Sequence, residues 1–282
     1  MTSTLLDQDR ITVATSCVPL LRLHGLDTFE KVMQYPGGQV IRDFPGRRTV
    51  RLELPPAPGA PAAVFLKRYE AGYLSAGRRL LRRLGWRSAQ DEARREWEGL
   101  AAVRSLGIAT ATPVAFGQEL QGGLVTRSFL MTAEIVAGVD GDRHLRNLPA
   151  VERGPFLGRV AELAKRVHSA GWVHKDLYVS HVLVAPGSGS GAEPTLFLID
   201  LQRLIQPTSW RERWQVKDLG ALAYSALKAG ASPKDLLTAW QRYCGTKELS
   251  KAQRSEARRV LRRVAWLKTR TPKHDKGFQQ LK

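Results

Sequence analysis

Two short apolar segments that each stand beside an aspartate constrain this chain more than any other feature. Residues 181–184 and 195–199 read as strands, and the loop between them is rich in glycine and serine. This pattern predicts a two-stranded hairpin. Asp176 lies shortly before the first strand, and Asp200 follows the second. We therefore expect the hairpin to bring both carboxylates to one edge of a small sheet.

Two carboxylates at one edge, with Lys175 beside the first, suit the transfer of a phosphoryl group. We expect Asp176 to orient a hydroxyl and take its proton, and Asp200 to hold Mg²⁺ on a nucleotide. The alternative is a buried strand pair whose aspartates only cap the strands. One such aspartate would be unremarkable, whereas two at this spacing favour the catalytic interpretation.

The same stretch resembles a known enzyme family. The string His-Lys-Asp-Leu-Tyr-x-x-His at residues 174–181 is followed by Ile-Asp-Leu-Gln-Arg at residues 199–203. Together they are similar to the lipopolysaccharide core heptose kinases, a family within the protein-kinase-like superfamily. The resemblance covers roughly residues 32–229. It implies a phosphotransferase that uses ATP and Mg²⁺ and acts on an alcohol group.

The resemblance also implies the fold. We expect a two-lobed, protein-kinase-like α+β structure with a β-rich N-lobe and a mainly helical C-lobe. The predicted division is an N-terminal extension at residues 1–27, the N-lobe at 28–136, and the C-lobe at 137–282 with a basic C-terminal helix and tail. A chain of 282 residues is long enough to give two lobes a real core.

Local patterns place the individual elements. A hairpin is predicted at residues 39–54 and a strand at residues 62–67. A short basic helix, in which leucines alternate with arginines, is predicted at residues 75–86. Longer helices are expected at residues 88–106, 152–169, 210–229, 232–243 and 249–267.

The resemblance assigns the nucleotide phosphates to the N-lobe. Lys67, at the end of its strand, is expected to reach the α- and β-phosphates of ATP, paired with Glu96 of the helix at residues 88–106. Without the resemblance, Lys67 would be an exposed lysine at a strand end and Glu96 plain helix surface. Gly37 and Gly38 are candidates for a loop over the phosphates, with an ordinary turn as the alternative.

The resemblance implies further roles around the two aspartates and at the hinge between the two lobes. Glu134 lies in the segment 131–138, whose backbone would meet the adenine ring. Asp218 and His174 are assigned structural roles, because a buried aspartate needs hydrogen-bond donors and the backbone of the catalytic loop would supply them. Lys175 is expected to offset charge on the transferred group. Protein kinases carry arginine at the position of Lys175, and lysine cannot form the two parallel hydrogen bonds that a guanidinium makes.

His181 is a second departure from protein kinases, which carry asparagine at this position. Imidazole is a poor ligand for Mg²⁺, so His181 either assists Asp200 or only holds the loop. The heptose kinases share a histidine here, which favours them. The segment between Asp200 and Asp218 is also short. It leaves little room for the activation segment and peptide groove of a protein kinase.

We therefore predict an ATP-dependent kinase that phosphorylates a heptose hydroxyl of the lipopolysaccharide inner core. One alternative is a kinase for another small molecule or for a serine or threonine side chain of a protein. The other alternative is a non-catalytic pseudokinase that binds an anionic membrane or glycan.

The net charge of +18 predicts an anionic partner: nucleic acid, an acidic membrane surface or a phosphorylated glycan. The alternative is a generic basic surface. No aromatic RNA-binding signature and no zinc-finger spacing occur, so we expect no nucleic acid. The lipopolysaccharide core or another phosphorylated glycan is the expected acceptor. The basic helices at residues 75–86 and 249–267 leave peripheral contact with an anionic membrane open.

Cys17 and Cys244 are the two cysteines of the chain, so no disulfide framework is expected and a reducing compartment fits. The first residues lack the pattern of a secretory signal, and no apolar run approaches the roughly 20 residues of a membrane span. We expect a cytoplasmic protein, with a peripheral place on the cytoplasmic face of the inner membrane left open. The sequence does not indicate the oligomeric state.

Overall fold

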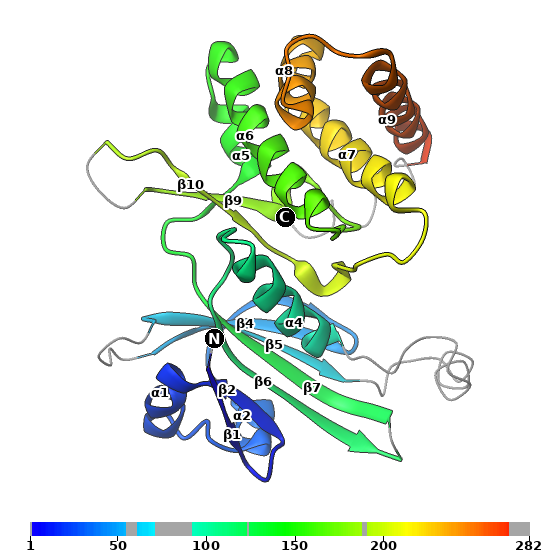
Figure 1. Ribbon diagram of the computed structural model, residues 1–282. Coiled ribbons are helices and arrows are strands. Elements are labelled where there is room, and N and C mark those ends of the chain that lie inside the picture. Colours follow the sequence, from blue (N-terminus) through cyan, green and yellow to red (C-terminus); the bar gives the residue numbers. More distant parts are fainter. Residues whose placement is uncertain (1, 55–60, 71–91, 123, 188–190, 271–282) are drawn as a thin grey trace. The chain divides into compact units, whose positions relative to one another are not determined.

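A computed structural model describes residues 2–54, 61–70, 92–122, 124–187 and 191–270. The chain divides into two compact units (Figure 1). Unit 1 comprises Met1–Ser105 and Thr110–Val136, and unit 2 comprises Leu106–Ala109 and Ala137–Lys282. The division falls after Val136, where the sequence places the end of the N-lobe.

Among the described residues, unit 1 holds an antiparallel sheet of seven strands in the order β1-β2-β6-β7-β5-β4-β3. The strands are β1 (Ser3–Leu6), β2 (Ile11–Ala14), β3 (Gln39–Phe44), β4 (Arg47–Glu53), β5 (Ala63–Glu70), β6 (Pro113–Gln121) and β7 (Leu124–Ala133). The helices of this unit are α1 (Val18–Leu23), α2 (Phe29–Gln34) and α4 (Glu92–Ser105), and the 3₁₀ turn η1 (Thr15–Cys17) precedes α1.

The two faces of this sheet have different roles because successive side chains of a strand point to opposite sides. Val64 and Leu66 of β5 are fully buried in a cluster with Phe29 of α2 and Leu21 of α1. Lys67 points to the other face, where it meets Glu96 of α4. One face therefore forms the core of unit 1, and the other presents the candidate site.

The N-terminal residues, which the sequence analysis expected to form an extension, belong to the sheet of unit 1. β1 pairs with β2, and β2 pairs with β6 of the main sheet. Ile11 and Val13 are fully buried there. Arg10 binds Glu30 of α2 and Glu119 of β6. Arg127 of β7 binds the same two carboxylates, and this network ties the N-terminal segment to the lobe. The sequence alone could not place these strands in the sheet, because β6, the partner of β2, begins about a hundred residues further along the chain.

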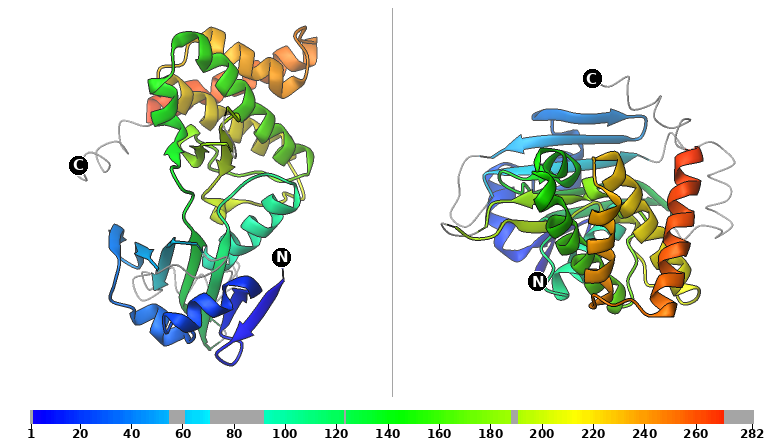
Figure 2. Two further views of the ribbon diagram at one scale, coloured as in Figure 1. Left: turned by 90° about the vertical axis from the view of Figure 1, so that its left-hand side faces the viewer. Right: turned by 90° about the horizontal axis from the view of Figure 1, so that it is seen from above.

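Unit 2 combines helices with a small sheet. The helices are α5 (Gly141–Asn147), α6 (Ala150–Ser169), α7 (Arg211–Lys228), α8 (Pro233–Cys244) and α9 (Lys251–Arg270). The sheet has the order β10-β9-β8, with strands β8 (Val139–Asp140), β9 (Val182–Ala185) and β10 (Thr195–Leu198). Two 3₁₀ turns, η3 (Val179–His181) and η4 (Leu201–Arg203), flank the hairpin of β9 and β10. α6 packs against α8, and α7 packs against α9 (Figure 2).

The helix boundaries of unit 2 follow from capping residues. The Ser232 side chain accepts from the Asp235 amide, and Asp235 bonds back to the Ser232 amide, which makes a capping box at the start of α8. Gly245 ends α8 in the left-handed conformation with φ 73°. In α9, Val260, Val264 and Leu267 are buried. This apolar stripe holds α9 to the unit.

Most predicted elements are confirmed within the described part of the chain. They include the hairpin of β3 and β4, the strand with Lys67, the hairpin of β9 and β10, and the long helices α6, α7, α8 and α9. The basic helix predicted at residues 75–86 and the tail beyond residue 270 lie outside the described residues. Over the ranges that are described, no helix is long and apolar enough to cross a membrane.

Candidate active site

Lys67 and Glu96, predicted as a pair, lie together in unit 1. Lys67 sits within β5, opposite Thr49 and Leu130 of the neighbouring strands. Its ammonium donates to Glu96 Oε1 at 2.5 Å, and the Glu96 side chain is 3% exposed. Glu96 Oε2 is buried without a hydrogen-bond partner among the described residues. A buried carboxylate thus orients the lysine, whose role toward a nucleotide stays a prediction.

Glu134 is engaged by residues of unit 1. Its carboxylate accepts two hydrogen bonds from the Arg51 guanidinium, at 2.6 and 2.7 Å. These bonds from Arg51 lower the pKa of Glu134. The Glu134 amide donates to the Ala63 carbonyl at 2.9 Å. The carboxylate and the amide of Glu134 both have partners within unit 1, so neither supports a contact with adenine. That expected contact stays a prediction.

Gly37 and Gly38 lie before β3, not in the turn that joins β3 to β4. That turn is formed by Pro45 and Gly46. Gly38 has φ 105°, and a Cβ there would stand 2.4 Å from Leu52 Cδ2 and 2.9 Å from the Arg51 carbonyl oxygen. Close packing and a positive φ therefore require this glycine. Its phosphate-binding role stays a prediction without support from this geometry.

The hairpin of unit 2 brings the stretches around Asp176 and Asp200 together, as the sequence predicts. The Ile199 amide donates to the His181 carbonyl at 3.0 Å, at the end of the hairpin where β9 begins and β10 ends. His181 Nδ1 in turn lies 2.7 Å from the Asp176 carbonyl oxygen. Asp200 has φ 60°, a left-handed conformation that aspartate tolerates better than most residues.

Arg203 is a site residue to which sequence reasoning assigned no role. The turn η4 follows Asp200 and returns the chain toward Asp176. Arg203 Nη1 lies 2.7 Å from both Asp176 Oδ1 and Asp176 Oδ2. The arginine at the end of the Ile-Asp-Leu-Gln-Arg string was the available signal. Only the turn geometry shows that it reaches the first carboxylate.

Asp200 and His181 have the chemistry of a partial metal site. The Asp176 carbonyl can only accept, so His181 Nδ1 carries the hydrogen, and a ring with this single hydrogen has a lone pair on Nε2. This Nε2 lies 3.5 Å from Asp200 Oδ2. Asp200 Oδ1 is buried and finds no hydrogen-bond partner in the described part of the chain. Asp200 is therefore suited to act as a ligand of Mg²⁺.

A metal here would need ligands from outside the protein. Across the described ranges, no group of three His, Cys, Asp or Glu side chains could hold a metal ion. Mg²⁺ commonly uses one or two carboxylates and takes its remaining ligands from water and from substrate phosphates. A single aspartate with a nearby histidine is thus compatible with a metal that arrives with a nucleotide.

Asp218 and His174 make the contacts that their predicted structural roles require. Asp218 is fully buried, and its Oδ2 accepts from the His174 amide at 2.7 Å. His168 Nε2 lies 3.3 Å from the same oxygen, and His168 Nδ1 lies 2.8 Å from the Tyr243 hydroxyl. His174 Nε2 donates to the Ile199 carbonyl at 3.0 Å. This network fixes the backbone on both sides of the candidate catalytic residues.

The stability of the protein should fall as the solution becomes acidic, because burial lowers the pKa of His174. The unfolded chain binds a proton on this residue near pH 6.5, whereas the folded chain does so only at lower pH. Unfolding therefore takes up a proton on His174 below about pH 6.5, and this residue lowers the stability there by at most about 1.4 kcal/mol per pH unit. Thermal melts between pH 7.5 and 5 measure this decline.

His174→Gln is the matched variant for this prediction. Glutamine has no group that titrates in this range, so the variant should lose less stability than the wild type over the same pH interval. Burial also lowers the pKa of His144, which leaves part of the decline in place. Equal pH dependence in the wild type and the variant would contradict the assignment.

The Lys175 ammonium makes a cation–π contact. Lys175 has a left-handed backbone with φ 68°, and its ammonium lies over the Trp214 ring, 4.9 Å from the centroid. Lys217 approaches the same ring at 4.2 Å. The expected role of Lys175 on the transferred group stays a prediction. Arg203 is the residue whose guanidinium contacts Asp176.

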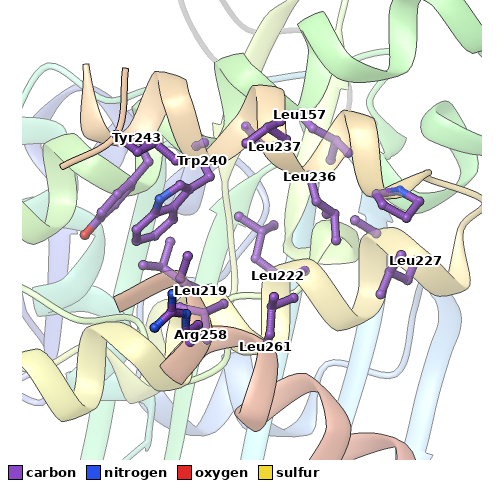
Figure 3. A pocket seen from close by; sticks show the side chains of 18 of the residues that line it. Leu157, Leu219, Leu222, Leu227, Leu236, Leu237, Trp240, Tyr243, Arg258 and Leu261 are labelled. Atoms are coloured by element: carbon purple, nitrogen blue, oxygen red, sulfur yellow. The ribbon is translucent and has the colours of Figure 1, made fainter. Parts of the chain in front are cut away.

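A second candidate site in unit 2 is an apolar pocket of about 590 Å³ between α6, α7, α8 and α9. Figure 3 shows Leu222, Leu236 and Trp240 among the side chains that line it. Arg254 and Arg258 of α9 also line this pocket. The sequence predicted α9 as a basic helix but gave no sign of the pocket, because the pocket arises only where four separate helices pack together.

Comparisons with known proteins identify relatives of this chain. The model of the lipopolysaccharide kinase (Kdo/WaaP) family matches residues 37–243. The lipopolysaccharide core heptose(I) kinase WaaP of Escherichia coli is 31% identical over 218 residues, 75% of this chain and 79% of the relative. WaaP of Pseudomonas aeruginosa is 32% identical over 231 residues, 78% and 81% of the two chains. A solved structure of WaaP in complex with acyl carrier protein is similar with a TM-score of 0.66 and 28% identity, covering 97% of this chain and 99% of its own.

Proposed function

The chain belongs to the lipopolysaccharide kinase (Kdo/WaaP) family, and we propose that it transfers a phosphoryl group from ATP to a heptose hydroxyl of the lipopolysaccharide inner core. The observation that carries this proposal is the hairpin of unit 2, which joins the stretches around Asp176 and Asp200. The names of the two relatives support the heptose as acceptor.

The donor side of the reaction is assigned to three residues. Lys67, oriented by Glu96, would bind the phosphates of ATP. Asp200 would hold Mg²⁺, with the lone pair of His181 Nε2 beside it. When bound, Mg²⁺ would neutralise charge on the phosphates. These groups position the nucleotide and stabilise charge, which is the main work of a protein in phosphoryl transfer.

The acceptor side is assigned to Asp176 and Arg203. Asp176 would accept the proton of the attacking hydroxyl. Arg203 holds both carboxylate oxygens of Asp176, and its side chain is 52% exposed, so it can move. We propose that Arg203 releases Asp176 when the substrates bind and then offsets charge on the transferred group, the role first expected of Lys175.

A panel of acceptors tests the proposed function. ATP consumption is measured with a heptose-containing core oligosaccharide, an aminoglycoside, a serine-containing peptide and no acceptor. Consumption that requires the oligosaccharide supports the proposal. If ATP consumption requires the aminoglycoside or the peptide, that molecule and not heptose is the acceptor. No consumption with any acceptor, together with nucleotide binding, would identify a pseudokinase.

The apolar pocket of unit 2 supports a protein partner. The solved relative forms a complex with acyl carrier protein. We propose that the present chain binds an acylated carrier protein, with the acyl chain in the pocket and Arg254 and Arg258 facing the carrier. A volume of about 590 Å³ lies within the usual range of ligand pockets, about 300–1,000 Å³. The two arginines would favour a carrier with negative charge.

Replacing Arg254 and Arg258 together by glutamate should weaken binding of an acylated carrier protein by tenfold or more, since about 1.4 kcal/mol of lost attraction is one factor of ten. Isothermal titration calorimetry measures the affinity at two salt concentrations. Arg262→Glu, an exposed arginine on the same helix, is the control and should bind like the wild type. Equal affinity of the wild type for the acylated and the unacylated carrier would contradict the assignment of the pocket.

A further inference from the structure

Cations gather around Trp214, close to the candidate catalytic loop. The ammonium groups of Lys175 and Lys217 lie 4.9 and 4.2 Å from the centroid of the Trp214 ring. Lys175 is the residue directly before Asp176, so the ring lies near the residue assigned as the base. Cation–π contacts hold ammonium groups in place.

The start of α7 adds to this positive region. Arg213 stands over the Trp210 ring at 5.6 Å, and Trp210 is 70% exposed. Trp210 is the N-cap residue of α7, and its side chain makes no capping hydrogen bond. The first amides of a helix carry a partial positive charge that favours an anion. An exposed indole is also a flat apolar surface suited to the face of a sugar ring.

Acidic side chains close in sequence to this region are engaged by other cations. The carboxylate of Asp176 is bound by Arg203, and Glu212 of the first turn of α7 pairs with Arg259 at 3.3 Å. Burial lowers the pKa of Lys217, and the neighbouring cations Arg263, Lys175, Arg213 and Arg203 lower it further. Like charges held this close repel each other, and a bound anion would relieve the repulsion.

We propose that Lys175, Arg213, Trp214 and Lys217, here called the Trp214 surface, bind an anionic group of the acceptor molecule. The group is a carboxylate or a phosphate on the same oligosaccharide whose hydroxyl reacts at Asp176. This inference rests on the proposed function and deepens it, because it names the residues that recognise the acceptor beside Asp176. A cationic acceptor such as an aminoglycoside would be repelled at this surface.

Three forms of one oligosaccharide test the proposal. They are a heptose-containing core oligosaccharide, the same molecule after reduction of its carboxylates to alcohols, and the same molecule after removal of its phosphates. Calorimetric titration measures their binding without any transfer of phosphate. The native form should bind roughly tenfold or more tightly than the form that lacks the recognised anion, the size expected for a charge-assisted contact. The form that loses affinity identifies the anion as a carboxylate or a phosphate.

Two variants locate the recognition on the Trp214 surface. Lys217→Gln and Arg213→Gln should each weaken binding of the native oligosaccharide and raise its KM roughly tenfold. The preference for the native form over the modified form should shrink by the same factor, while the affinity for ATP stays unchanged. Lys251→Gln, an exposed lysine at the start of α9, is the control and should leave the KM unaltered.

The outcomes separate this inference from the proposed function. If the oligosaccharide binds but ATP is never consumed, the kinase assignment fails while the binding surface stands. If heptose is phosphorylated but all three forms bind equally, the Trp214 surface does not recognise an anion and the inference is overturned. A loss of ATP affinity in Lys217→Gln would likewise overturn it, because the surface would then serve the nucleotide.

Discussion

Replacing Asp176 by asparagine should lower kcat by about 10²–10⁴-fold or more and leave ATP binding nearly unchanged. The substitution keeps the shape of the side chain and removes the charge that accepts the proton of the hydroxyl. General-base catalysis contributes a factor of this size. ATP affinity should survive because Lys67, Glu96 and Asp200 act on the donor. Calorimetric titration of ATP and initial rates with a heptose-containing acceptor give the two quantities.

The environment of Asp176 sharpens this experiment. Its carboxylate is held by Arg203, so the variant also loses an ion pair within unit 2. A thermal melt of the variant without ligand shows whether the fold has suffered. Asp43→Asn is the control: it makes the same chemical change at an aspartate whose side chain is 61% exposed. A folded Asp176→Asn that turns over at the rate of the wild type would show that Asp176 is not the base.

Asp200→Asn should abolish the stabilisation that Mg²⁺ adds to nucleotide binding and lower turnover by at least about 10²-fold. A loss of this size is typical when one electrostatic stabiliser of the transition state is removed. Asparagine is preferable to alanine because Asp200 has φ 60°, a conformation in which alanine is strained. The buried Oδ1 of Asp200 supports its role as ligand.

The measurement is a set of thermal melts with ATP alone and with ATP plus Mg²⁺. A ligand that binds only the folded protein raises the melting temperature to a degree set by its concentration and affinity. The wild type should gain stability when Mg²⁺ joins ATP, and Asp200→Asn should not. His181→Ala removes the imidazole without adding an oxygen ligand and tests whether the imidazole contributes. An unchanged effect of Mg²⁺ in a folded Asp200→Asn would exclude Asp200 as the metal residue.

The hairpin of unit 2 could be predicted because its signals are local. Two apolar segments, a glycine-rich connection and two aspartates lie close together in the sequence, between Asp176 and Asp200. The partners Lys67 and Glu96 were reached through the resemblance, since a strand lysine and a helix glutamate carry no local sign of pairing. The structure shows the contact at 2.5 Å. Its role in binding a nucleotide is still to be tested.

The remaining features depend on contacts between distant segments. The strands at the N-terminus join the sheet through β6, and the network of Arg127, Glu30 and Glu119 brings together residues as many as 97 positions apart. Arg203 reaches Asp176 because Asp200 adopts a left-handed conformation and starts a tight turn. The pocket and the Trp214 surface also arise from packing between elements. No pattern within a single segment reports such contacts.

The central claim is that Asp176 directs a phosphoryl group from ATP to a heptose hydroxyl. The most direct measurement incubates the protein with γ-labelled ATP, Mg²⁺ and a core oligosaccharide that lacks heptose phosphate, and then locates the new phosphate by mass spectrometry and ³¹P NMR. The account predicts one added phosphate on a heptose with the wild type and none with Asp176→Asn. A phosphate on another sugar, or equal labelling by both proteins, would contradict the account.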